Sequence, residues 1–271
     1  MIPADDSPMT DAFGLADKVA IVTGAGKGIG AAIARIFADA GADVALCART
    51  ETDLRSVAAD VQARGRRALV LAGDVNDLDY LARAVEETTS TLGGLDIVVN
   101  NAGGSVSKPM LKTTVTDLEK AFHFNISSPF ELCRLAVPHL LERGGGSIVN
   151  IGSVAGLNAS RGSLTHSLMK SAVAQLTRLL AAELSPRIRV NAVLPGAVET
   201  DSFRTWLDHQ PPQAREGMAE RTAMRRNGVP DDIAPAVLYF ASPASAWVTG
   251  KLLAVDGSPA PDLIPNRLPD L

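Results

Sequence analysis

A glycine-rich segment lies near the start of the chain, between an apolar run and a segment with helical periodicity. It reads Thr23-Gly24-Ala25-Gly26-Lys27-Gly28-Ile29-Gly30, so that Gly24, Gly28 and Gly30 have the spacing Gly-x-x-x-Gly-x-Gly. Glycines at this spacing let the backbone turn tightly and approach a pyrophosphate, which then rests on the exposed N–H groups at the start of the helix. This context predicts a dinucleotide site that includes Lys27 and Ile29, whereas a flexible turn is the simpler alternative.

The next apolar run ends in Ala48 and Arg49, without a carboxylate at the position that commonly contacts a free ribose 2′-hydroxyl. An arginine suits a 2′-phosphate instead, because its planar guanidinium donates two charge-assisted hydrogen bonds. Lys27 adds a second positive charge from the glycine segment. These residues favour NADP(H) over NAD(H) as the cofactor. If both cations are only solvated surface residues, the missing carboxylate still disfavours NAD(H).

Two side chains that can exchange protons follow much later in the chain. His166 and Lys170 are four residues apart in a segment with helical periodicity, so we expect them on one face of a helix. A positive Lys170 and an oxidised nicotinamide would both disfavour imidazolium, and we therefore expect His166 to be neutral near pH 7. A neutral imidazole accepts an alcohol proton but does not readily donate one. If His166 exchanges a proton with a substrate, this favours alcohol oxidation near neutral pH; the alternative is that His166 merely fills space beside a cleft.

A framework of strands must bring these residues to one edge. Short β-branched runs predict strands at 18–23, 43–47, 68–71, 95–99, 147–151, 189–193 and 252–255. Segments with helical periodicity predict helices at 29–40, 51–64, 77–92, 115–141, 164–184 and 231–241. This alternation predicts βαβ units. Right-handed crossovers then give an α/β, single-domain Rossmann fold, a doubly wound parallel sheet of about seven strands with helices on both faces.

No linker or repeat divides the sequence. We expect an N-terminal extension at 1–14, one Rossmann-type domain at 15–257 and a proline-rich C-terminal tail at 258–271. The stretch 196–230 interrupts the alternation and is expected to be an irregular segment that covers the substrate. Within it, Phe203, Trp206 and Leu207 have the spacing of one helix face and could either close over a hydrophobic substrate or only pack.

Composition excludes several classes of protein. The net charge of −4 argues against a general nucleic-acid binder. No apolar run reaches the ~18 residues needed to span a bilayer, and the acidic N-terminus does not resemble a signal peptide, so we expect no membrane partner and a cytoplasmic protein. Cys47 and Cys133 belong to no metal-ligand cluster and are expected to be buried and reduced, with no metal site.

Further motifs, in the right order, resemble those of the short-chain dehydrogenase/reductase family. The glycine segment matches the family's Thr-Gly-x-x-x-Gly-x-Gly turn, and the resemblance extends from about Leu15 to Gly257. Within the family, the sequence is similar to bacterial 3-oxoacyl-carrier-protein reductases and hydroxysteroid dehydrogenases. The resemblance implies further cofactor contacts, beside the adenine through Asp74 and Val75, beside the adenosine through Asn101, Ala102 and Gly103, and near the nicotinamide through Pro195, Gly196, Val198 and Thr200.

The resemblance also implies a set of catalytic residues. Asn125 lies where the family keeps an asparagine that kinks a long helix and holds a relay water, and Ser153 lies at the position of the substrate-binding serine. Lys170 corresponds to the lysine that holds the nicotinamide ribose. His166 stands where the family has the tyrosine that exchanges a proton with the substrate, and Tyr80 and Tyr239 are predicted on other helices, away from the site.

The sequence therefore predicts an NADP(H)-dependent oxidoreductase that interconverts a secondary alcohol and a ketone, with an altered acid–base step at His166. The alternative is a catalytically idle, NADP(H)-binding homologue that acts as a structural or regulatory subunit. Retention of Asn125, Ser153 and Lys170 favours the enzyme. By resemblance, the helices at 115–141 and 164–184 would form the interface of a homotetramer.

The remaining histidines and two residues after Ser153 complete the predictions. His123 is expected to pack within the long helix, His139 to lie on the surface, and His209 either to contact the substrate or only to belong to the 196–230 segment. Leu157 and Asn158, which follow Ser153, are plausible pocket residues.

Overall fold

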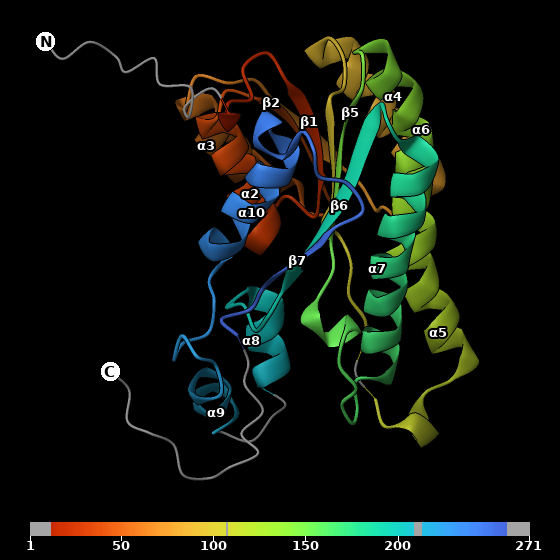
Figure 1. The fold of residues 1–271 in the computed structure, drawn as a ribbon, viewed down its shortest axis with the longest axis vertical. Coiled ribbons are helices and arrows are strands. Elements are labelled where there is room, and N and C mark those ends of the chain that lie inside the picture. The colour runs from red at the N-terminus through yellow and green to blue at the C-terminus, as the bar shows by residue number, and fades with distance from the viewer. Residues whose placement is uncertain (1–11, 107, 209–212, 259–271) are drawn as a thin grey trace, which may run out of the picture.

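The computed structural model of the chain describes residues 12–106, 108–208 and 213–258. Seven strands form one parallel sheet in the order β3-β2-β1-β4-β5-β6-β7. The chain therefore fills the sheet from β1 outward in one direction, then returns to the centre and fills the other half (Figure 1). This confirms the predicted doubly wound fold with seven strands. The strands are β1 Val19–Thr23, β2 Asp43–Ala48, β3 Ala68–Ala72, β4 Ile97–Asn100, β5 Gly146–Ile151, β6 Ile188–Pro195 and β7 Leu252–Val255.

Continuous apolar sequences form the central strands. All five residues of β1 and all four of β4 are buried. A strand that is covered on both faces has no solvent side, and for that reason its sequence shows a run of apolar residues rather than alternation.

Helices cover both faces of the sheet (Figure 1). On one face lie α2 Gly28–Asp39, α3 Glu51–Ala63 and α10 Pro230–Ala241, and their apolar sides pack on the sheet in one core that includes Ile33, Leu54 and Phe240. On the other face lie α4 Leu78–Leu92, α6 Ser128–Glu142 and α7 Leu164–Leu184, whose core includes Leu81, Leu132 and Ala181. The predicted burial of Cys47 and Cys133 is confirmed, and both are free thiols.

The predicted single helix at 115–141 is wrong in one respect. The structure has α5 Val115–Phe122, then a π-helical turn η2 His123–Ser127, and then α6. Side chains compensate for the changed backbone pairing, because Asn125 Nδ2 donates to the carbonyl of Ala121 (2.8 Å) and Ser128 Oγ donates to that of His123 (3.0 Å). A π turn inserts one residue into the helical repeat, so the periodicity of α5 and α6 is out of phase across it.

The stretch 196–230 is more regular than predicted. It contains two short helices, α8 Asp201–Leu207 and α9 Ala214–Glu220. Thr200 caps α8, since its Oγ1 accepts a hydrogen bond of 3.2 Å from the N–H of Phe203. The helix-face spacing of Phe203, Trp206 and Leu207 already indicates α8, whereas α9 has only about two turns, too few to show a repeat. Short 3₁₀ turns complete the fold at Met110–Lys112, Val154–Gly156 and Pro243–Ser245.

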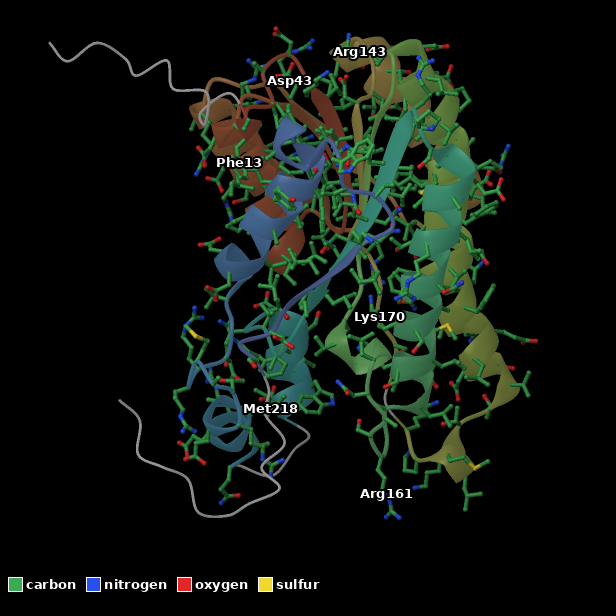
Figure 2. The ribbon with its side chains drawn as sticks, viewed as in Figure 1. Phe13, Asp43, Arg143, Arg161, Lys170 and Met218 are labelled. Carbon is green, nitrogen blue, oxygen red and sulfur yellow. The ribbon has the colours of Figure 1, made fainter. Side chains whose placement is uncertain are left out.

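The two edges of the sheet differ in chemistry (Figure 2). At the amino ends of the strands, the buried carboxylate of Asp43 pairs with Arg66 (2.8 Å) and Arg67 (2.7 Å), and Arg143 pairs with Asp96 (3.2 Å). Arg161 and Met218 mark the opposite end of the molecule, and Lys170 lies between the two ends. Ion pairs thus cover the side of the sheet where the strands begin. The side where the strands end, here called the carboxyl edge, is left for a ligand.

Within the described residues, no helix has both the length and the apolarity to cross a bilayer. The same residues contain no cluster of three or more histidine, cysteine or acidic side chains arranged to bind a metal ion. Most of the predicted N-terminal extension and C-terminal tail lie outside the described residues.

Candidate active site

A cleft of about 1180 Å³ lies along the carboxyl edge of the sheet. The cleft includes the point between β1 and β4 where the order of strand addition reverses. Doubly wound sheets bind their ligands at this switch point. Each strand from β1 to β6 contributes at least one residue at or just beyond its end, among them Gly24, Ala48, Gly73, Asn101, Ile151 and Pro195.

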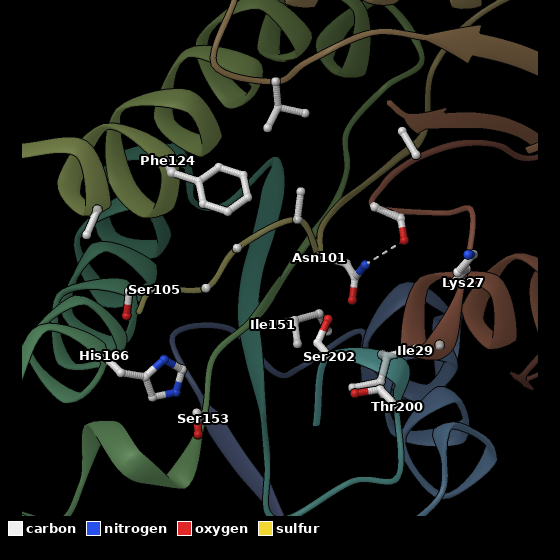
Figure 3. A pocket seen from close by; sticks show the side chains of 18 of the residues that line it. Lys27, Ile29, Asn101, Ser105, Phe124, Ile151, Ser153, His166, Thr200 and Ser202 are labelled. Atoms are coloured by element: carbon white, nitrogen blue, oxygen red, sulfur yellow. Dashed lines mark hydrogen bonds between the residues drawn. The ribbon is translucent and has the colours of Figure 1, made fainter. Parts of the chain in front are cut away.

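The glycine turn forms one wall of the cleft. Gly24 has φ +65°, a backbone conformation that residues with a Cβ rarely adopt. A Cβ on Gly30 would stand 2.2 Å from the carbonyl oxygen of Gly24, so that α2 can approach β1 only with glycine at this position. Asn101 holds the turn, because its Nδ2 donates to the carbonyls of Thr23 (2.8 Å) and Gly24 (3.2 Å) (Figure 3).

Most of the predicted cofactor residues line the cleft, and Gly30 does not. It is buried behind the turn, where it permits close packing rather than direct contact with a ligand. The predicted residues that line the cleft are Gly24, Lys27, Gly28, Ile29, Arg49, Asp74, Val75, Asn101, Ala102, Gly103, Lys170, Pro195, Gly196, Val198 and Thr200.

Asp53 is a cleft residue that the sequence analysis missed. It lies in the first turn of α3, and its Oδ2 is 3.2 Å from Lys27 Nζ. The predicted cation Lys27 is therefore already paired, whereas Arg49 is exposed at the end of β2. No sequence pattern indicates this contact, because it depends on how α3 packs against the turn.

Asp74 and Val75 line the opposite wall, beyond the end of β3. Asp74 Oδ1 accepts hydrogen bonds from the N–H (3.0 Å) and the Nδ2 (2.8 Å) of Asn76. These bonds fix the loop and leave the second carboxylate oxygen for another partner.

The buried cation of the cleft is Lys170. Its Nζ donates to the carbonyl of Ile151 (3.0 Å), and burial lowers the pKa of its ammonium to about 8. Below that pH the ammonium is charged, and it has donors beyond the one used by Ile151.

His166 lies on the same helix, α7, and its ring projects into the cleft (Figure 3). Burial lowers the pKa of this imidazole to about 4, and the neighbouring charge of Lys170 contributes to the shift. Its charge state agrees with the sequence-based expectation, since imidazole with this pKa is neutral at pH 7.

Ser153 faces the cleft from the end of β5. Its Oγ accepts a hydrogen bond of 3.1 Å from the N–H of Ala155, which starts the 3₁₀ turn at Val154–Gly156. Because the oxygen is the acceptor in that bond, the hydroxyl proton can be donated to a ligand.

Asn125 lies behind the cleft rather than in its wall. Its Oδ1 accepts from the N–H of Gly104 (2.9 Å), and its Nδ2 donates to the carbonyl of Gly104 (2.8 Å). A second, small cavity of about 10 Å³ lies beside Asn125, Lys170 and Asn150, which is about the volume that one water needs.

The structure changes the interpretation of several other residues. His123 does not pack within the helix, because its Nε2 is 2.9 Å from the carbonyl of Asn76 and its ring lines the cleft. Ser105, which the sequence analysis did not single out, lines the cleft with a buried Oγ that has no partner among the described residues. Phe203 lines the cleft and stacks on Trp206, with ring centroids 5.8 Å apart.

Other predictions fall away from the cleft or outside the described residues. Leu157 and Asn158 are exposed and do not line it. Tyr80 donates to the carbonyl of Leu71 (2.7 Å), and Tyr239 packs between Phe13 and Phe240, so neither tyrosine reaches the site. His139 is ion-paired with Glu142 at the surface, and His209 lies outside the described residues.

These features fit a nicotinamide dinucleotide. The turn at Gly24 exposes backbone N–H groups at the start of α2, Arg49 and Lys27 supply cations near the end of β2, and Lys170 supplies a buried cation. The Thr200 hydroxyl and the Ser153 hydroxyl each keep a proton to donate.

Comparison with known proteins decides the family. A model described as "Enoyl-(Acyl carrier protein) reductase" matches residues 24–257. The chain belongs to the short-chain dehydrogenase/reductase family. Members of this family are oxidoreductases that use a nicotinamide cofactor, in agreement with the geometry of the cleft.

Individual relatives cover nearly the whole chain. An uncharacterized oxidoreductase of Mycobacterium tuberculosis is 44% identical over 262 residues, which are 96% of this chain and 99% of the relative. The 7α-hydroxysteroid dehydrogenase of Escherichia coli is 36% identical over 255 residues, 94% of this chain and 98% of the relative. A solved structure of a 7α-hydroxysteroid dehydrogenase with NADH and 7-oxo glycochenodeoxycholic acid has a TM-score of 0.89 at 36% identity and covers 94% and 99% of the two chains.

Proposed function

We propose that this short-chain dehydrogenase/reductase transfers a hydride between NADP(H) and a secondary alcohol or ketone, with His166 in the role of proton carrier. The observation that carries the proposal is the position of His166 and Lys170, one turn apart on α7, in the same cleft as the glycine turn. The family relationship supports the oxidoreductase activity, and Arg49 supports a phosphorylated cofactor.

The cofactor, when bound, supplies the hydride acceptor for oxidation and the donor for reduction. We assign its pyrophosphate to the turn that contains Gly24 and Gly28, its adenosine to the wall formed by Asp74 and Ala102, and its nicotinamide half to Lys170 and Thr200. This assignment follows the family resemblance and agrees with the residues that line the cleft.

The protein's own contribution is proton transfer and orientation. In oxidation, neutral His166 would accept the hydroxyl proton of the alcohol on a ring nitrogen, directly or through one water, while the carbon that bears this hydroxyl gives up its hydride and becomes the carbonyl carbon. Ser153 donates a hydrogen bond to the substrate oxygen. In reduction, His166 must first be protonated, and with a pKa of about 4 it carries that proton only in acid.

Asn125 and the small cavity beside Lys170 provide a route for the proton to leave. The cavity has room for about one water, and Lys170 lies on its wall. We propose that this water is held by Asn125, as the family resemblance implies, and relays protons from Lys170.

The substrate is proposed to be a hydrophobic small molecule, in agreement with Phe203 and Trp206 on α8. A homotetramer that acts in the cytoplasm is part of the same proposal. The tetramer is supported by the family resemblance and by the exposed apolar side chains of α5, α6 and α7, such as Phe122, Phe130 and Leu179.

The test is His166→Tyr. Because phenol is a stronger proton donor to an alkoxide than neutral imidazole, ketone reduction at pH 7 is expected to rise by about 10²-fold or more, within the range typical of general acid catalysis. The measurement is the absorbance of the reduced nicotinamide, with purified protein and a panel of alcohols and ketones. His139→Tyr is the matched control, since His139 is a surface residue paired with Glu142.

An unchanged rate of ketone reduction in His166→Tyr would contradict the acid–base role of His166. If both proteins bind NADP(H) but turn over no member of the panel, the idle cofactor-binding homologue becomes the better description. The positions of Ser153 and Lys170 in the cleft argue for the enzyme.

A further inference from the structure

One corner of the cleft, at the end of β2, contains three charged side chains. Arg49 follows β2, Lys27 belongs to the glycine turn, and Asp53 lies in the first turn of α3. The Lys27 ammonium is 3.2 Å from the Asp53 carboxylate. For the side chain of Arg49, the described part of the chain shows neither an ion pair nor a hydrogen bond.

Asp53 is held against the glycine turn by packing. A Cβ built on Gly26 would be 3.1 Å from Asp53 Cβ and 3.6 Å from Ala48 Cβ, so the three residues are immediate neighbours. Ala48 occupies the position at which a carboxylate commonly contacts a free ribose 2′-hydroxyl. The structure thus brings a carboxylate to that corner from a different element.

The two members of the ion pair differ in exposure. The Asp53 side chain is 27% exposed, whereas that of Lys27 is 60% exposed. Lys27 can therefore turn toward a ligand, while Asp53 remains at the wall. A ligand that recruits Lys27 must compete with Asp53 for it.

The charges in this corner have opposite effects on the two forms of the cofactor. A 2′-phosphate, with a charge of about −1.5 to −2 near neutral pH, is attracted by Arg49 and Lys27 but repelled by Asp53. A free ribose hydroxyl has no such charge, and it can donate a hydrogen bond to a carboxylate.

We propose that Asp53, through its ion pair with Lys27, determines how strongly the cleft discriminates between nicotinamide dinucleotides with and without a 2′-phosphate. Asp53 weakens the preference for the phosphorylated form that Arg49 and Lys27 create, and it offers an acceptor to the unphosphorylated ribose. This inference rests on the proposed function, because it requires a dinucleotide in the cleft.

The experiment measures dissociation constants by calorimetry on the full chain, with four probes: NADP⁺, NAD⁺, 2′,5′-ADP and 5′-AMP. The last two probes lack the nicotinamide, so they report on this corner without any dependence on turnover. For Asp53→Asn, affinity for NADP⁺ and 2′,5′-ADP is expected to rise about three- to tenfold, the effect of removing one nearby, partly solvated charge. Affinity for NAD⁺ and 5′-AMP should stay level or fall.

Two further variants test the coupling. In Lys27→Ala, affinity for the phosphorylated probes should fall by about tenfold or more, since a cation is lost and Asp53 is left unpaired. Adding Asp53→Asn to Lys27→Ala should restore part of that affinity. The control is Asp60→Asn, because Asp60 also links α3 to α2, through Arg35 at 2.8 Å, but does not line the cleft.

The inference is wrong if Asp53→Asn leaves the NADP⁺-to-NAD⁺ affinity ratio within twofold of the unsubstituted protein, or if Asp60→Asn changes it equally. The proposed function survives either result as long as the unsubstituted chain binds a nicotinamide dinucleotide. If that chain binds none of the four probes, the proposed function and the inference fail together. Should Asp53→Asn not fold, Asp53→Ser removes the same charge and is judged by the same ratio.

Discussion

At the scale of single residues, the electrostatics of the cleft set the direction in which protons can move. His166 has its pKa lowered to about 4, first by burial and then by Lys170, so it is a base at neutral pH and an acid only below that value. Lys170 has its pKa lowered to about 8 by burial, so it is a cation at neutral pH and loses its charge above about pH 8. Between about pH 4 and pH 8, His166 is therefore a neutral base while Lys170 is a cation.

This predicts a bell-shaped pH profile for alcohol oxidation. The kcat/KM should rise as His166 loses its proton near pH 4 and fall as Lys170 loses its charge near pH 8. Initial rates of alcohol oxidation, measured in buffers that overlap in pH, give this profile. In His166→Gln the acid limb should disappear while the alkaline limb remains. An acid limb near the free imidazole value of about 6.5 would contradict the effect of burial on His166.

A residue that only the structure identified leads to a second prediction. The buried Oγ of Ser105 has no partner among the described residues, so a substrate that shifts this part of the cleft wall can supply one. Ser105→Ala is expected to raise KM for the preferred alcohol by about threefold to tenfold, the usual net value of one hydrogen bond, with little change in kcat. Ser163→Ala serves as control, since Ser163 Oγ bonds other serines outside the cleft wall. A change in kcat alone would argue against a substrate contact.

At the scale of elements, the π turn η2 ties the second helical layer to the loop after β4. The Asn125 side chain makes three hydrogen bonds, two with the N–H and carbonyl of Gly104 and one with the carbonyl of Ala121. The loop 103–106 carries Ser105 and faces the cleft, so the shape of this wall depends on a residue that does not line it.

The element-scale prediction concerns Asn125→Ala. The substitution leaves the half-buried backbone groups of Gly104 and the buried carbonyl of Ala121 without these partners, and we expect the free energy of unfolding to fall by about 2–3 kcal/mol. Urea denaturation followed by circular dichroism measures it. Asn158→Ala is the control, because Asn158 is exposed and makes a single bond of 3.3 Å. Equal stability in the two variants would show that the loop finds other partners.

At the scale of the whole molecule, large apolar side chains remain exposed on the outer helical layer. Leu179 on α7 is 55% exposed, and Phe130 on α6 is 45% exposed. A folded chain gains by covering such groups, and the family resemblance suggests other copies of the chain as the cover.

The prediction at this scale is that Leu179→Glu shifts the protein from the proposed tetramer to smaller species. A charge placed in an apolar interface is left without a partner, which weakens the association. Sedimentation velocity at several concentrations reads out the assembly. Glu183→Lys, an exposed change near the end of α7, controls for a nonspecific effect of charge. A monomer for the unsubstituted protein would refute the tetramer.

Local sequence patterns were sufficient to predict the parallel sheet, the glycine turn and the position of His166 and Lys170 on one face of a helix. Buried strands show as apolar runs, a turn at Gly24 requires glycine, and residues one helical turn apart share a face. The neutral state of His166 was also predicted from its neighbour Lys170, but its main cause, burial, came only with the tertiary structure. Each of these predictions depends on residues a few positions apart.

Only the tertiary structure revealed Asp53 at the corner of the cleft beside the end of β2, the Ser105 hydroxyl, which has no partner among the described residues, and the imidazole of His123 on the cleft wall. Asp53 meets Lys27 because α3 packs against the start of α2, and His123 meets Asn76 because η2 approaches the loop after β3. Such contacts join elements distant in sequence, and their geometry depends on packing over the whole core. A sequence pattern records the residues available for a site, while the packing of the folded chain selects those that meet.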